Sequence, residues 1–188
     1  MTNRERFIEL LRSTKREGIE GLILYLDEKT DMFTAPASVR YHGNYAGGLC
    51  EHCLSVYDNL VTLKNAFKFN VPDDSLIIVA LLHDLAKVNF YEEFERNVKV
   101  DGAWVQQKQY RVRDIHNRFV YGSHEQTSVF IATQFIPLSI EEQVSIISHH
   151  GGVDQHGLHI DTVSDIYNSY TLSIYLHIAD SIDAFKHE

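Results

Sequence analysis

The stretch LLHDLAK, which ends at Lys87, constrains this chain most strongly. An apolar run from Leu76 to Leu82 leads directly into His83 and Asp84, and Lys87 follows three residues after Asp84. On a helix, these three polar side chains would share roughly one face. Charges beside apolar surface are costly unless they are paired or bind a metal. The stretch alone fits a core histidine beside a capping aspartate equally well, so the rest of the chain must decide.

The composition is that of an acidic globular protein. The chain has 188 residues, of which 44% are hydrophobic and 23% charged, and its formal net charge is -9. This length supports one domain with a sizeable core, so we expect a single domain over residues 1–188. The acidic balance argues against binding to duplex DNA, which requires a basic face. Small anionic substrates remain possible, because bound divalent metals reverse the local field.

Three features lead us to expect a soluble, cytoplasmic protein without membrane association. No apolar run approaches the ~20 residues of a membrane span. The N-terminal sequence MTNRERFIELLR has no apolar signal-peptide core. The two cysteines, Cys50 and Cys53, imply no disulfide framework. They bracket His52, but we interpret them as buried reduced thiols rather than as a redox pair or a zinc site. The sequence does not indicate an oligomeric state.

Helical periodicity runs through most of the chain and predicts an all-α bundle. The expected helices lie at about 4–14, 17–28, 49–67, from 72 through LLHDLAK, 124–135, 139–149 and 164–185. Ser139 and Glu142 have the spacing of a capping box. The first two of these helices, within residues 4–28, precede the others.

One segment departs from this pattern and predicts a small β-hairpin near residues 97–108. In NVKV-DG-AWVQ, apolar residues alternate on both sides of Asp101 and Gly102, which is the usual short hairpin signal. Residues 87–121 carry seven Lys or Arg and five Asp or Glu, a net charge of +2, which leaves -11 for the remainder. The hairpin is either a lid over an anionic substrate or simply a solvated insertion.

Several other polar residues could join His83 and Asp84 in one site. The candidates are His52, His124, His149, His150 and Asp180. The four histidines lie near predicted helix ends. Asp180 interrupts an otherwise apolar helix, LHIADSIDAF, so its carboxylate must be solvated, paired or bound to a metal.

The ordered set resembles the HD-domain superfamily of metal-dependent phosphohydrolases over roughly residues 40–185. The order is His52, His83 with Asp84, His124, His149 and Asp180. The motifs GGL-x-EH-x-LSV, LLHD-x-x-K, SHHG and ADS-x-DA are similar to those in HD domains of bacterial 3′–5′ exoribonucleases. APAS-x-x-YHG-x-YAGGL-x-EH resembles small HD proteins of bacteria and phages. No GYP motif follows His150, and the OB domain of the exoribonucleases is missing, which argues against cyclic-dinucleotide cleavage and processive RNA degradation.

The resemblance implies a site with divalent metal ions, two of them by position. The first metal would be held by His52, His83, Asp84 and Asp180, and the second by Asp84, His124 and His149. Such ligands suit Mn, Fe, Co, Ni or Zn. Two metals would bind a phosphoryl oxygen and generate a hydroxide nucleophile.

The resemblance also implies catalytic and substrate-binding roles. Asp84, itself a ligand, and Lys87 are the expected catalytic residues, with Lys87 stabilising charge on the phosphoryl group. His150 is a further catalytic candidate. Arg40 and His42, together with Lys87, are candidates for substrate binding.

These residues lead us to expect a phosphomonoesterase or phosphodiesterase acting on a nucleotide or short oligonucleotide. Two alternatives remain open at this point. Some members of the superfamily use the same six ligands to hold two irons and activate O₂, which would make the protein an oxygenase. A metal-stabilised regulatory module without catalysis is the other alternative.

Overall fold

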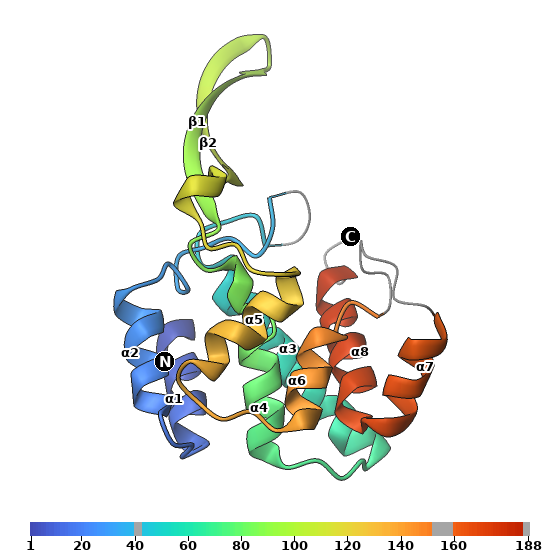
Figure 1. Ribbon diagram of the computed structural model, residues 1–188. Helices are drawn as coiled ribbons and strands as arrows, with labels where there is room; N and C mark the ends of the chain where they lie inside the picture. The colour runs from blue at the N-terminus through green and yellow to red at the C-terminus, as the bar shows by residue number, and fades with distance from the viewer. Residues whose placement is uncertain (40–42, 152–159, 186–188) are drawn as a thin grey trace.

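The computed structural model of the protein describes residues 1–39, 43–151 and 160–185. This part of the chain is mostly helical and carries a two-stranded antiparallel sheet (Figure 1), as the sequence predicted. In chain order the elements are α1 (Asn3–Ser13), α2 (Ile19–Glu28), α3 (Gly48–Phe67), α4 (Asp73–Leu82), the short 3₁₀ helix η1 (Leu85–Lys87), β1 (Tyr91–Val100), β2 (Ala103–Val112), the 3₁₀ helix η2 (Ile115–Asn117), α5 (His124–Thr133), α6 (Ile140–Ile147), α7 (Ile160–Ser169) and α8 (Thr171–Phe185). Among the described residues, none of the helices combines the length and the apolar character that crossing a membrane requires.

Helix α4 occupies the middle of the bundle, with α1, α3, α5, α6 and α8 packed around it (Figure 1). Every residue from Ser75 to Leu82 is buried. A helix that is apolar on all sides must lie in the interior. The residues that follow α4, His83 and Asp84, are therefore delivered to the centre of the molecule, where both are almost completely buried.

Capping boxes set the start of α5, which carries His124, and of α6, which ends just before His149. At α6, the Ser139 hydroxyl accepts from the Glu142 amide at 3.2 Å, and Glu142 accepts from the Ser139 amide at 2.8 Å, which confirms the predicted box. Ser123 and Gln126 form the same arrangement at α5 and place His124 in its first turn. Each box satisfies amide groups that a helix start leaves unpaired.

The predicted continuation of α4 through LLHDLAK is wrong. The helix ends at Leu82, and Leu85–Lys87 form a separate 3₁₀ turn. His83 Nδ1 donates to the Ala80 carbonyl at 2.9 Å. A continuing helix would offer that same carbonyl to the Asp84 amide. The side chain of His83 thus competes with the next helical hydrogen bond, and the backbone turns at Asp84.

The expected single helix over residues 164–185 is also wrong, because two helices, α7 and α8, meet at Tyr170. The junction sequence is Asn168, Ser169, Tyr170 and Thr171. Polar, aromatic and β-branched residues of these kinds are weaker helix formers than Ala or Leu. Helix α8 packs on both α3 and α6, so this break orients Asp180 toward the centre of the bundle.

The hairpin is present and is longer than the predicted 97–108. Its strands pair from Tyr91 opposite Val112 to Val100 opposite Ala103. Asp101 and Gly102 both have positive φ, 49° and 85°, as a two-residue hairpin turn requires. The hairpin projects away from the helices (Figure 1), and Trp104 is 72% exposed. This arrangement matches the solvated alternative rather than a closed lid.

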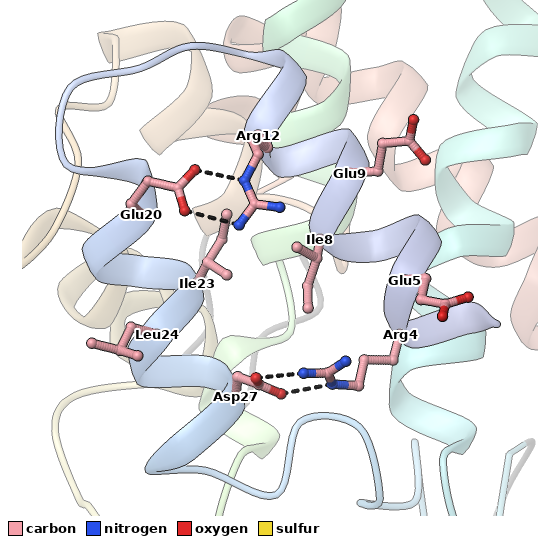
Figure 2. A pocket seen from close by; sticks show the side chains of 9 residues that line it. All are labelled: Arg4, Glu5, Ile8, Glu9, Arg12, Glu20, Ile23, Leu24 and Asp27. Atoms are coloured by element: carbon pink, nitrogen blue, oxygen red, sulfur yellow. Dashed lines mark hydrogen bonds and ion pairs between the residues drawn. The ribbon is translucent and has the colours of Figure 1, made fainter. Parts of the chain in front are cut away.

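A pocket between α1 and α2 lies apart from every predicted site residue. Figure 2 shows two ion pairs joining these helices across it, Arg4 with Asp27 and Arg12 with Glu20, each with both hydrogen bonds between 2.5 and 2.9 Å. Because the charged groups along it are largely paired with each other, we assign this pocket a structural role.

Candidate metal centre

The structure brings together the six residues that the sequence predicted as metal ligands. His52 comes from α3, His83 and Asp84 from the end of α4, His124 from the start of α5, His149 from the end of α6 and Asp180 from α8. Among the described residues, three sets have ligand atoms within 4.8 Å of one another. These sets are His52, His83 and Asp84; His83, His149 and Asp180; and Asp84, His124 and His149.

The first part of this cluster surrounds Nε2 of His52. That atom lies 3.2 Å from His83 Nε2 and 3.4 Å from Asp84 Oδ2. It also lies 3.2 Å from Asp180 Oδ1. A tetrahedral ion with metal–ligand bonds of ~2.1 Å would hold its ligand atoms ~3.4 Å apart. Each of the three distances from His52 Nε2 therefore suits a pair of ligands on one small cation, and His52, His83 and Asp84 form one of the three sets, whereas Asp180 is grouped with His83 and His149.

The two oxygens of Asp84 face different histidines. Oδ2 lies on the side of His52 and His83 and accepts a hydrogen bond from Lys87 Nζ at 2.6 Å. Oδ1 lies 2.5 Å from His124 Nε2. Its distance to His149 Nε2 is 3.9 Å. A carboxylate that presents its oxygens to two groups of ligands is suited to bridge two ions.

His83 and His149 each direct an unprotonated Nε2 toward the cluster. His83 Nδ1 donates to the Ala80 carbonyl at 2.9 Å. His149 Nδ1 donates to the Ile146 carbonyl at 2.7 Å. A carbonyl only accepts, so each ring carries its proton on Nδ1 and keeps a lone pair on Nε2. His149 Nε2 is buried and has no hydrogen-bond partner among the described residues. Such a buried unpaired acceptor requires an explanation, and a bound cation supplies one.

Burial and neighbouring charges set the protonation of the cluster. Burial lowers the pKa of His149 to about 3 and also lowers that of His83, so both rings are neutral. Burial would raise the pKa of Asp84, but the Lys87 ammonium holds it well below its usual value. Burial would also raise the pKa of Asp180, but the hydrogen bond with His52 lowers it below its usual value. His83 and His149 thus present neutral imidazoles, and Asp84 and Asp180 present ionised carboxylates, which are the forms that ligate metals.

Comparison with known proteins gives the family. Residues 49–185, which include the whole cluster, match the family model described as HD domain. The chain belongs to the HD-domain family. It is 34% identical over 90 residues to a dihydroneopterin 2′,3′-cyclic phosphate phosphodiesterase of Methanocaldococcus jannaschii. That match covers 45% of this chain and 34% of the relative, so the chain spans about a third of the relative's length. No solved structure matches this HD domain significantly.

A pocket of about 610 Å³ opens onto the cluster of this HD domain. Its lining combines Asp84 and Asp180 with Lys87, His150 and His177, and it also includes Ala37, Ser38, Tyr91, Ser181, Ala184 and Phe185. Ionisable groups and aromatic side chains therefore share one pocket. HD domains bind divalent metals, and the histidines and aspartates of the cluster are of the kinds that could hold them.

Lys87 is a buried partner of the cluster rather than a solvated side chain that ends a helix. Its side chain is 16% exposed. Burial lowers the pKa of Lys87, but the Asp84 carboxylate more than offsets this effect. The pKa is therefore raised overall, and the ammonium is charged. A fixed positive charge therefore stands at the wall of the pocket.

The remaining predicted residues have different outcomes. His150 lines the pocket, and its Nδ1 lies 2.5 Å from Oε1 of Glu125, which is 7% exposed. Burial lowers the pKa of His150, but the hydrogen bond to Glu125 and the charges of the neighbouring carboxylates together have the larger opposite effect, so the pKa is raised overall. Arg40 and His42 lie outside the described residues. Cys50 and Cys53 are free and buried, as predicted, and burial raises the pKa of Cys50 to about 12.

Sequence reasoning missed two partners of the histidines, Glu125 and Asp183. Glu125 directly follows His124 in the chain, but nothing in the sequence links it to His150, 25 residues later. Asp183 lies three residues after Asp180, and this helical spacing was the available signal that both share a face.

Metal binding by this HD domain is expected to release a proton from His52. Burial lowers the pKa of His52, but Asp180, Asp183 and Asp84 raise it to about 10. Below that pH the metal-free ring is protonated on both nitrogens, and a metal must displace the Nε2 proton. Affinity should therefore rise with pH up to the pKa. Calorimetric titration with Mn²⁺ near pH ~8, in buffers of different ionisation enthalpy, measures the release. An apparent enthalpy that is the same in every buffer would contradict this expectation.

Proposed function

We propose that this HD domain is a metal-dependent phosphohydrolase that cleaves a phosphomonoester or phosphodiester of a nucleotide or short oligonucleotide. The observation that carries the proposal is the convergence of histidine nitrogens and aspartate oxygens on one cluster, two of whose carboxylates, Asp84 and Asp180, line a pocket together with the Lys87 ammonium. The similarity to a phosphodiesterase that acts on a cyclic phosphate supports the same class of reaction.

The proposed ligands divide at Asp84. His52, His83, Asp84 and Asp180, which meet around His52 Nε2, would hold one divalent ion. Asp84, His124 and His149 would hold a second. When bound, such ions supply Lewis acidity toward a phosphoryl oxygen and a hydroxide nucleophile at neutral pH. The ligand chemistry is compatible with Mn, Fe, Co, Ni or Zn.

The protein's own groups have separate tasks in the proposed reaction. Lys87 would bind a non-bridging phosphoryl oxygen and stabilise the charge that spreads over these oxygens in the transition state. His150, oriented by Glu125, is within the same pocket and would donate a hydrogen bond or a proton to the leaving oxygen. The buried position of Asp84 keeps its oxygens fixed between the two groups of histidines.

The pocket's shape supports an organic phosphate rather than a polymeric duplex. About 610 Å³ is within the range of pockets that hold small molecules. Tyr91 and Phe185 supply aromatic surface to the lining, against which a planar ring could pack. A nucleotide or another heteroaromatic phosphate fits this combination of ionisable and aromatic groups.

Metal analysis followed by a substrate screen tests the proposal. Protein purified without oxygen is analysed for bound metals, then assayed with Mn, Fe, Co, Ni or Zn on nucleoside monophosphates, 2′,3′-cyclic phosphates and short oligonucleotides. We expect phosphate ester cleavage that requires metal and not O₂. Turnover that requires O₂ would indicate the oxygenase instead. Metal binding with no turnover of any ester would indicate the regulatory module.

A further inference from the structure

Asp183 is a buried carboxylate on the far side of the His52 ring from the candidate metal centre. It lies on α8, one helical turn after Asp180, and is 5% exposed. Its Oδ2 accepts a hydrogen bond from His52 Nδ1 at 2.7 Å. A buried carboxylate is costly, and Asp183 adds a third to a region that already contains Asp84 and Asp180. It does not belong to any of the groups of described residues that could hold a metal.

The positions of the histidines within their helices explain why His52 needs this carboxylate. His83 and His149 lie just beyond the ends of α4 and α6, and each donates to a carbonyl of its own last turn. The last four carbonyls of a helix have no helical partner, so they are available to a side chain. A ring there is oriented by its own helix.

His52 has no such carbonyl within reach of its own helix. It is the fifth residue of α3, a helix of 20 residues, and the carbonyls around it are engaged in the helix's own hydrogen bonds. An acceptor for its Nδ1 must therefore come from another element. Helix α8 packs against α3 and supplies Asp183.

We propose that Asp183 is the positioning residue that turns the His52 ring so that Nε2 faces Asp84, Asp180 and the metal between them. This inference rests on the proposed metal-dependent function. A carboxylate on the outer nitrogen fixes the ring orientation and increases the electron donation of the ligating nitrogen. The orientation of His52 thereby depends on a replaceable side chain, whereas that of His83 and His149 depends on backbone carbonyls.

Two variants and a control separate this role from a purely structural one. Asp183→Ala removes both the acceptor and the charge. Asp183→Asn keeps the size of the side chain and one acceptor oxygen but removes the charge, and it serves if the alanine variant fails to fold. Asp58→Ala is the matched control, because Asp58 is an exposed carboxylate of α3 that pairs with Arg6 of α1 at 2.5 Å.

The measurement is Mn²⁺ affinity by calorimetric titration of metal-free full-length protein, with thermal melting in parallel. We expect Asp183→Ala to weaken metal binding about 10- to 100-fold, and Asp183→Asn to weaken it several-fold. The control should bind Mn²⁺ as the wild type does. A folded variant with changed melting temperature but wild-type Mn²⁺ affinity would overturn the positioning role and leave the proposed function intact. A wild-type protein that binds no divalent metal would overturn both.

Discussion

The Lys87→Met variant is expected to lose about 10²-fold or more in kcat while it keeps its bound metal. Lys87 Nζ lies 2.6 Å from Asp84 Oδ2, so its ammonium is held at the metal centre without being a ligand itself. Phosphoryl transfer spreads negative charge over the phosphoryl oxygens in the transition state. A buried ammonium stabilises that charge more than the charge of the ground state. The methionine side chain fills similar volume and removes the charge, so the loss should fall on kcat.

Two further variants sharpen this test. Lys87→Arg should recover little activity, because the planar guanidinium approaches phosphoryl oxygens differently. Lys108→Met is the matched control, since Lys108 pairs with Glu93 at 2.7 Å on the exposed hairpin. Its kcat should equal that of the wild type. The test is steady-state kinetics on any ester that the wild type cleaves, with metal content measured for each variant. Wild-type kcat in a fully loaded Lys87→Met protein would remove Lys87 from the mechanism.

His149→Ala is expected to lower the number of bound metals from two toward one and to reduce activity severely. The buried Nε2 of His149 has no partner among the described residues and lies 3.9 Å from Asp84 Oδ1. His124 Nε2 lies on the same oxygen at 2.5 Å. Neither residue is in the group formed by His52, His83 and Asp84. His124→Ala should therefore have the same effect on stoichiometry while the first ion remains bound.

Metal content is measured by elemental analysis after equilibration with a divalent metal and removal of excess. The matched control is His116→Ala, because His116 is an exposed histidine of η2. Circular dichroism establishes that each variant remains folded. If both cluster variants bind as much metal as the wild type, the centre holds a single ion and the assignment of a second site to His124 and His149 is wrong.

The sequence was sufficient for most of the elements, which depend on patterns within single helices, and for the residues that converge, whose order along the chain resembles that of HD domains. The apolar run of α4 required burial, so the residues after it had to lie inside the bundle. The hydrogen-bond partners of the histidine ring nitrogens could not be predicted from the sequence. His52 with Asp183 and His150 with Glu125 join residues from separate elements, and only the packing of those elements brings them together.

The two wrong helix boundaries also have local causes that periodicity does not capture. At the end of α4, the side chain of His83 takes a carbonyl that the helix would otherwise use. At Tyr170, a short run of weak helix formers divides α7 from α8 although the apolar spacing continues. In both places a few side chains override a pattern that extends over many residues.

The base of the hairpin has a consequence for how this protein can vary. The Arg113 amide donates to the Phe90 carbonyl at 2.9 Å, so the chain leaves the helical body and returns to it at neighbouring points. Strands that pair in this way can gain or lose length in steps of two residues each without reversing which side chains share a face. The outer hairpin is thus free to diverge or to be exchanged for another extension, while Tyr91 at its root stays in the wall of the pocket. Relatives with different extensions at this point could retain the same pocket chemistry while the surface formed by the extension differs.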